Sequence, residues 1–280
     1  MEWIGLPLAF GVALAMVPAG VRGLSGAGHV RENYRGRILA FPLGAILATT
    51  ALVALAPLAF LNDRGDLDLL DPELRRWIPY VLGVAFLGFL DDALGQGTLA
   101  ETPRGWRGHA QALREGRLST GAIKAVGALA LAAYVVSGRG LESFEYLADV
   151  ALLILATNLF NLLDLRPGRT EKALVLLGIG LCVGAWSGEP IELMGIFLGP
   201  VLVGAWFTLR ERAMLGDTGS NLVGAIGGVW LLTTLDETGR LIALAVVAAL
   251  TVYGELRSIS RAVESVPPLR SLDSLGRVHE

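Results

Sequence analysis

Long apolar runs, separated by short polar connections, dominate the pattern of the chain. A membrane-spanning helix needs about 20 apolar residues, and about 17 at the short end. The third run is shorter, but Trp77 and Pro79 indicate that its helix starts near the membrane interface. The pattern predicts an all-α, polytopic membrane helix bundle with about nine transmembrane helices. The nine runs are 3–19, 38–61, 78–90, 121–137, 147–163, 173–187, 191–209, 219–235 and 241–255.

Lysine and arginine are distributed unevenly among the connections. If the N-terminus lies outside, 18 of the 23 basic residues fall in the inner connections and tail, and five fall outside. The 26 acidic residues split evenly, 13 and 13. A bias confined to Lys and Arg is the signature of the positive-inside rule. We therefore expect the N-terminus outside, the C-terminus in the cytoplasm, and a multi-pass location in the cell inner or plasma membrane.

The same pattern predicts a single integral membrane domain over 1–280. Its longest connection, about 91–120, is expected in the cytoplasm, and 256–280 forms a cytoplasmic C-terminal tail. Composition agrees: 53% of residues are hydrophobic and 18% are charged, against about 25% charged in soluble domains. Glycine, at 36 residues, suits closely packed membrane helices. The net charge of −3, with no strongly basic face, argues against a nucleic-acid partner.

Four clusters of polar residues interrupt this apolar pattern, and all four fall at predicted cytoplasmic helix ends. Carboxylates at membrane depth are costly and usually face a cavity or a partner. Residues from helix ends placed at random would scatter over both membrane faces, so their sidedness favours one shared site. The clusters are Gly88 to Asp92, Lys124 after the loop Gly116 to Gly121, Thr157 to Asp164, and Gly216 to Asn221.

The adjacent pair Asp91 and Asp92 predicts a cation site. Two neighbouring carboxylates repel unless a cation lies between them. Magnesium meets that need, because it binds hard oxygen ligands together with substrate phosphates. The alternative is a helix end wetted by the cytosol, with no ligand at all.

Two further clusters suit a phosphorylated ligand. Asn158, Asn161 and Asp164 repeat every three residues and so share one helix face; the alternative is hydrogen bonding between helices. Gly216 to Ser220 reads as a helix start that receives phosphate, with Asp217 on the metal; the alternative is a capped polar turn. Carboxylates, cations and a glycine-rich turn together are what phosphoryl transfer requires.

At these residues the chain resembles the polyprenyl-phosphate N-acetylhexosamine-1-phosphate transferase family. That family includes phospho-N-acetylmuramoyl-pentapeptide transferase and N-acetylglucosamine-1-phosphate transferases. The resemblance spans roughly 20–235. It rests on the aspartate pair Asp91-Asp92, the downstream Lys124, an Asn-x-x-Asn-x-x-Asp motif at 158–164, and a Gly-Asp-x-Gly-Ser motif at 216–220. It implies an enzyme of cell envelope glycan biosynthesis that uses Mg²⁺ to transfer a sugar 1-phosphate from a nucleotide-diphosphate sugar, expected to be UDP-linked, to a polyprenyl phosphate.

The resemblance also implies roles for individual residues. Asp91, Asp92, Lys124 and Asp217 are the expected catalytic residues, and the three aspartates are the expected metal ligands. The expected substrate-binding residues are Asn158, Asn161, Asp164, Arg166, Arg169, Gly216, Gly219 and Ser220.

The chain departs from the family in three places. The third motif continues with Arg166, Pro167 and Arg169 where relatives have a second aspartate, a histidine-rich loop is missing, and Met214 replaces an aromatic residue. Two alternatives therefore stay open: a catalytically silent relative that binds polyprenyl phosphate, and an ion-coupled transporter. The remaining expected partners are membrane lipid and, as an open alternative, a second copy in a homodimer.

Overall fold

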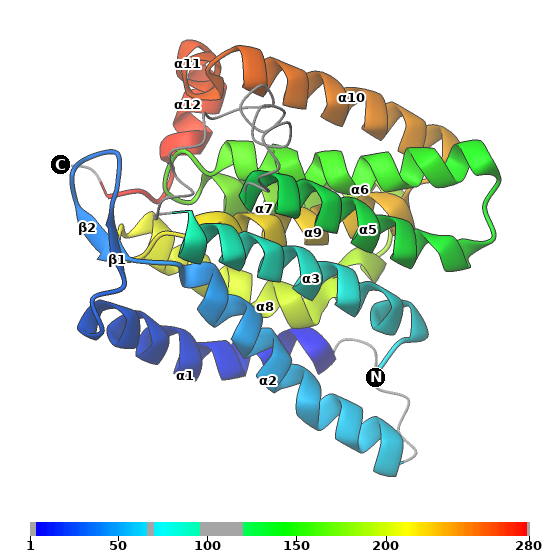
Figure 1. The fold of residues 1–280 in the computed structure, drawn as a ribbon, viewed down its shortest axis with the longest axis horizontal. Helices are drawn as coiled ribbons and strands as arrows, with labels where there is room; N and C mark the ends of the chain where they lie inside the picture. The colour runs from blue at the N-terminus through cyan, green and yellow to red at the C-terminus, as the bar shows by residue number, and fades with distance from the viewer. Residues whose placement is uncertain (1–3, 66–69, 96–119, 279–280) are drawn as a thin grey trace.

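The computed structural model of the protein is a bundle of long helices (Figure 1), described over residues 4–65, 70–95 and 120–278. The connection expected at 91–120 falls mostly outside these ranges. Each of the nine apolar runs overlaps one long helix in the described residues. These helices are α1 (Gly5–Gly26), α2 (Leu43–Arg64), α3 (Pro72–Leu94), α5 (Thr120–Val136), α6 (Ser143–Leu163), α7 (Arg169–Ala185), α8 (Glu189–Leu209), α9 (Gly216–Thr234) and α10 (Glu237–Leu256).

Shorter elements join or follow these helices. Two antiparallel strands, β1 (Val30–Glu32) and β2 (Ile38–Ala40), form a small hairpin between α1 and α2. The 3₁₀-helix η3 (Ser137–Arg139) follows α5, and two short helices, α11 (Ile259–Ser265) and α12 (Pro267–Ser274), form the tail. The prediction that 38–61 is one helix was wrong at its start, because 38–40 pair with β1 and the helix begins only after Pro42.

Seven of the long helices have the length and apolar composition needed to cross a membrane: α1, α2, α3, α5 with η3, α6, α8 and α10. Helix α7 has 17 residues and α9 begins with a polar segment, so neither is in this set. A multi-pass membrane protein is therefore confirmed at this level. The count of nine spans and the orientation of the termini stay predictions.

Helix α9 forms the centre of the bundle. Every residue from Thr218 to Leu232 is buried, and four of them are glycines, which let neighbouring helices approach closely. Helices α2, α3, α6, α7 and α8 all pack against it, while α1 lies outside α8 and α10 outside α6 (Figure 1). This arrangement fixes the first turn of α9, which carries Asp217, relative to five other helices.

Gly44 of α2 and Gly219 of α9 form a close backbone contact in this centre. A Cβ atom built on Gly44 would lie 2.0 Å from the backbone nitrogen of Gly219, well inside van der Waals contact. The obstacle is backbone, so rotation of a side chain cannot relieve it. The two glycines therefore set how closely the starts of α2 and α9 approach.

We expect Gly44→Ala to destabilise the folded bundle, because overpacking a rigid contact costs about 1–3 kcal/mol. The matched control is Gly11→Ala in α1, where an added Cβ meets nothing within 4 Å. Thermal unfolding of the purified proteins in detergent is the measurement. A lowered midpoint is expected for Gly44→Ala alone, and equal midpoints for the two variants would contradict the close contact.

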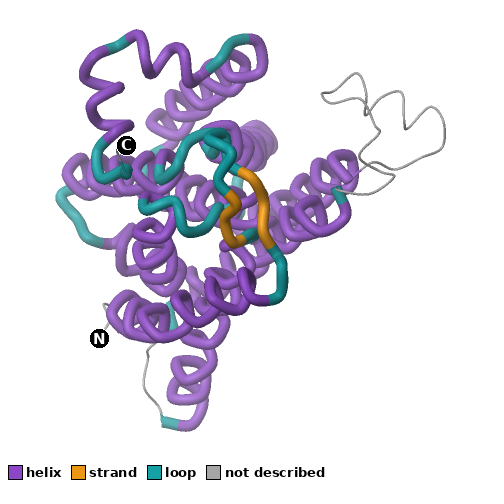
Figure 2. Tube along the Cα trace, turned by 90° about the vertical axis from the view of Figure 1, so that its left-hand side faces the viewer, coloured by secondary structure: helices purple, strands orange, loops and turns teal. Residues whose placement is uncertain are grey.

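The hairpin and the tail lie at the same end of the bundle, where α3 and α6 end and α9 begins (Figure 1). Figure 2 looks onto this end, with the hairpin in front of the loops that connect the helices. The β2 segment is joined to the α8–α9 connection: Met214 N donates to Ala40 O at 2.9 Å, and Leu43 N donates to Met214 O at 2.8 Å. These bonds hold the residues that lead into Gly216 and Asp217.

Candidate functional site

The centre of the candidate site is an ion pair between Lys124 and Asp217. Lys124 lies in the first turns of α5 and Asp217 in the first turn of α9, 93 positions later. The Lys124 Nζ donates to Asp217 Oδ2 at 2.6 Å, and the two side chains are 22% and 34% exposed. Both groups are thus held by the protein yet remain accessible to a ligand.

Two more predicted residues contact Asp217. The Asp91 carboxyl, in the last turn of α3, forms side-chain hydrogen bonds with the Asp217 carboxyl and with Thr120. The side chain of Asn161, in the last turn of α6, forms a hydrogen bond with Asp217 and also donates to Asn221 Oδ1 at 3.2 Å. Four helix ends from distant parts of the sequence therefore meet at one carboxylate.

Asp92 faces a different direction from Asp91 and caps α9. Its Oδ1 accepts from Asp217 N at 2.9 Å, and its Oδ2 accepts from Thr218 N at 2.9 Å and Thr218 Oγ1 at 2.6 Å. A carboxylate at this place is stabilised by the amides and the dipole at a helix start. In this arrangement the amides of Asp217 and Thr218 donate to Asp92 and not to a phosphate, and both oxygens of Asp92 are engaged. The phosphate-binding role of this helix start stays a prediction.

Gly216, Gly219 and Ser220 determine the backbone conformation and packing of the turn that leads into α9. Gly216 has φ +72, and a Cβ on it would lie 2.6 Å from Asp92 Oδ2. Gly219 packs against Gly44, and Ser220 is fully buried with its hydroxyl donating to Asp217 O at 3.4 Å. These three predicted substrate-binding residues therefore build the turn that presents Asp217.

The α6–α7 connection, 164–168, brings Asp164 and Arg166 next to this centre. Asp164 follows the last residue of α6, and its pKa is raised well above the usual range by burial, with smaller contributions from Glu171 and Asp217. The Arg166 guanidinium stacks on the Tyr34 ring, 4.1 Å from its centroid. Asn158 lies one turn before Asn161 and is half-buried.

Arg169 is held away from any ligand. Its Nε and Nη2 donate to the two oxygens of Asp273 at 2.8 and 2.9 Å, and its side chain is 6% exposed. A bidentate arginine–carboxylate pair of this kind uses the fork that would otherwise bind phosphate. Its predicted substrate contact is therefore not what the geometry supports.

A cavity of about 70 Å³ lies between the hairpin, the α6–α7 connection and the α8–α9 connection. Asp164 and Arg166 line one side, Asn33 and Tyr34 a second, and Met214 with its neighbours a third. The sequence did not single out Asn33 or Tyr34, because the hairpin that carries them has no polar motif. Asn221 accepts from Asn161 and donates to Val84 O of α3. It lies in the predicted cluster Gly216 to Asn221, but no role was predicted for it.

The donor chemistry of this centre fits magnesium. Asp91 and Asp217 supply two hard carboxylates, with the Asn161 amide beside them, and magnesium is usually bound by one or two carboxylates plus substrate phosphates. Within the described ranges, no group of three or more His, Cys, Asp or Glu side chains gathers that could hold a metal ion. The predicted set of three aspartate ligands is therefore not assembled, because both oxygens of Asp92 bind the start of α9. The centre therefore suits a metal that arrives with a phosphorylated substrate better than a permanently caged one.

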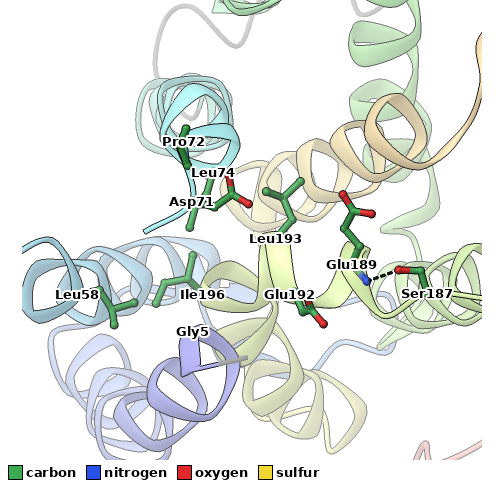
Figure 3. Close-up of a pocket in the computed structure, with 10 residues that line it drawn as sticks. All are labelled: Gly5, Leu58, Asp71, Pro72, Leu74, Ser187, Glu189, Glu192, Leu193 and Ile196. Carbon is green, nitrogen blue, oxygen red and sulfur yellow. Dashed lines mark hydrogen bonds between the residues drawn. The ribbon is translucent and has the colours of Figure 1, made fainter. Parts of the chain in front are cut away.

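A second, larger cavity lies at the opposite end of the bundle, where α3 and α8 begin (Figure 3). Its volume is about 480 Å³, and its charged lining residues are Asp71, Glu189 and Glu192. Asp71 caps α3 by accepting from Glu73 N at 2.7 Å. Because its charges are all negative, this cavity does not suit a phosphate, and the site at the other end remains the candidate.

Comparison with known proteins adds no assignment: no protein-family model matches the chain, and no curated protein matches its sequence.

Proposed function

We propose that this protein is a magnesium-dependent transferase that moves a sugar 1-phosphate from a nucleotide-diphosphate sugar to a polyprenyl phosphate. The reaction takes place at the cytoplasmic membrane face in the orientation predicted from the Lys and Arg bias. The silent lipid-binding relative and the ion-coupled transporter are the outcomes against which the proposal is tested.

One observation carries the proposal: the convergence of Lys124, Asp91 and Asp217 at one end of an apolar bundle. These residues come from α5, α3 and α9, so nothing local in the sequence forces them together. A cation beside two carboxylates at the membrane boundary suits a reaction between a lipid phosphate and a soluble pyrophosphate. An ion path would instead favour charged groups near the membrane midplane.

The chemistry is the exchange of one phosphorus–oxygen bond for another. An oxygen of the polyprenyl phosphate attacks the phosphorus bonded to the sugar, and the bond to the nucleoside monophosphate breaks. Magnesium, when bound at Asp217 and Asp91, would neutralise charge on the pyrophosphate. Lys124 stabilises negative charge on the transferring phosphoryl group. In this proposal Asp91, half-buried at the end of α3, accepts any proton left on the lipid phosphate.

The donor binds on the side of the small cavity, whose lining includes Met214 and Leu215 just before α9. Arg166 and Tyr34 offer a cationic plane and an aromatic ring, and Asp164 and Asn33 offer polar groups. At about 70 Å³, against about 300–1,000 Å³ for ordinary ligand pockets, this cavity receives only a small part of the donor. The expected preference for a small donor rests on the missing histidine-rich loop. Arg166→Ala is expected to raise the Michaelis constant for the donor more than it lowers turnover, because the side chain binds away from the reacting bond.

The test is a screen of nucleotide sugars with undecaprenyl phosphate and magnesium, using the purified full-length protein. We expect turnover of a simple hexosamine donor and none of the muramoyl-pentapeptide donor. Efficient use of the pentapeptide donor would contradict the expected preference for a small donor. Silence with every donor would favour the non-catalytic alternative, and a magnesium-independent ion flux in liposomes would favour the transporter.

A further inference from the structure

A buried ion triad joins the C-terminal tail to the body of the protein. Asp273 in α12 accepts from Arg169 of α7 and from Arg277, whose Nη1 and Nη2 donate to its two oxygens at 2.9 and 2.7 Å. The three side chains are between 6% and 10% exposed. A triad this well enclosed holds one geometry, unlike an exposed surface pair.

The tail contacts the α6–α7 connection on both sides of the triad. Arg277 Nε donates to Pro167 O at 2.8 Å, so the connection is held through its backbone. Arg166 Nη2 pairs with Glu264 of α11 at 3.2 Å, and Arg169 Nη1 donates to Ser260 Oγ at 3.0 Å. The tail therefore contacts the connection at Arg166, through α11, and at Pro167, through the segment after α12, within a few residues of Asp164.

The end of α12 is fixed by a separate group. Lys172 Nζ donates to the carbonyl oxygens of Leu272, Asp273 and Leu275, at the end of the helix. Arg35 of the hairpin donates to Val278 O at 3.3 Å. The pKa of Asp273 is lowered to about 2, chiefly by its hydrogen bonds with Arg169 and Arg277, which outweigh the effect of burial. Its charge therefore persists throughout the neutral and mildly acidic range.

We infer that the C-terminal tail, 257–278, is a clamp that fixes the α6–α7 connection for donor binding, with Asp273 as its positioning residue. That the fixed connection serves donor binding rests on the proposed function, in which Asp164 and Arg166 line the donor cavity. Asp273 touches no substrate group in this arrangement. It acts through Arg169 and Arg277, which set the backbone of the connection.

The test combines hydrogen–deuterium exchange with donor kinetics on Asp273→Asn in the full chain. Replacing the carboxylate leaves two buried arginines with one neutral amide oxygen and adds an NH₂ donor beside them. Exchange of the peptide covering 162–170 is therefore expected to rise ~10-fold. The donor Michaelis constant is expected to rise by about 10-fold with turnover nearly unchanged. Asp273→Glu keeps the carboxylate and should restore both quantities. The matched control is Arg270→Gln, an exposed position of the same helix.

The two readouts separate the clamp from the proposed reaction. Unchanged exchange over 162–170 in Asp273→Asn would overturn the clamp, and so would faster exchange with an unchanged donor Michaelis constant. If the wild-type protein turns over no donor, the proposed function fails, while exchange still decides whether the tail holds the connection. Should Asp273→Asn not yield folded protein, Arg277→Gln removes the Pro167 contact and faces the same two criteria.

Discussion

Asp217→Asn is expected to abolish transfer while the protein remains folded. The substitution keeps the shape and one acceptor for Lys124, but removes the negative charge that a metal ligand needs. Losing that ligand costs several kcal/mol of transition-state stabilisation, which lowers turnover by ~10³-fold or more. Lys124 is 22% exposed, so the ammonium left without its partner can be hydrated. Turnover and thermal unfolding should be measured on the same preparation.

The matched control is Glu255→Gln, which removes a carboxylate from an exposed position near the end of α10. It should retain the turnover of the wild-type protein. Near-normal turnover in Asp217→Asn would assign the chemistry to another group. A comparable loss in Glu255→Gln would show that any change of charge at this end of the bundle impairs the protein.

Substitution of the two neighbouring aspartates is expected to have different effects, on stability for Asp92 and on turnover for Asp91. Asp92→Asn replaces a carboxylate that accepts three hydrogen bonds with an amide that has one acceptor and brings two donors. Its free energy of unfolding should fall by about 3 kcal/mol, because bonds to a charged acceptor at a buried helix start are lost. Asp91→Asn should change stability by less than about 1 kcal/mol and lower turnover by ~100-fold.

Thermal unfolding followed by tryptophan fluorescence, together with turnover, distinguishes the two variants, since the protein has six tryptophans. Each variant is the control for the other, because both remove the same charge from adjacent positions. Equal losses of stability would contradict the capping role of Asp92. Full turnover in Asp91→Asn would remove Asp91 from the reacting centre.

Most of the helices could be predicted because a helix that crosses a bilayer needs about 20 consecutive apolar residues, and the polar connections between them are easily told apart. The meeting of Asp91, Lys124, Asn161 and Asp217 could also be predicted in outline, since all fall at helix ends on one side. The different contacts of the adjacent residues Asp91 and Asp92 could not be predicted. Asp91 and Asp92 look alike in the sequence, but a step of one residue turns the side chain by about 100° around a helix.

The partners of the arginines were beyond prediction for a different reason. Arg166 and Arg169 follow the Asn-x-x-Asn-x-x-Asp motif at 158–164, where a substrate contact was expected. Nothing in the local sequence indicates that Asp273, 104 positions after Arg169, binds its guanidinium. The hairpin was missed because Ile38 to Ala40 continue into the apolar run of α2. Local hydrophobicity cannot separate a short strand from the start of a helix there.

The most direct measurement of the central claim is mass spectrometry of the lipid product formed by the purified protein. The reaction contains undecaprenyl phosphate, a UDP-hexosamine and magnesium, with Asp217→Asn as the parallel sample. The account predicts one undecaprenyl diphosphosugar for each uridine monophosphate released, with magnesium required and neither product formed by the variant. Release of uridine diphosphate with a singly phosphorylated lipid, or equal product from the wild-type protein and Asp217→Asn, would contradict it.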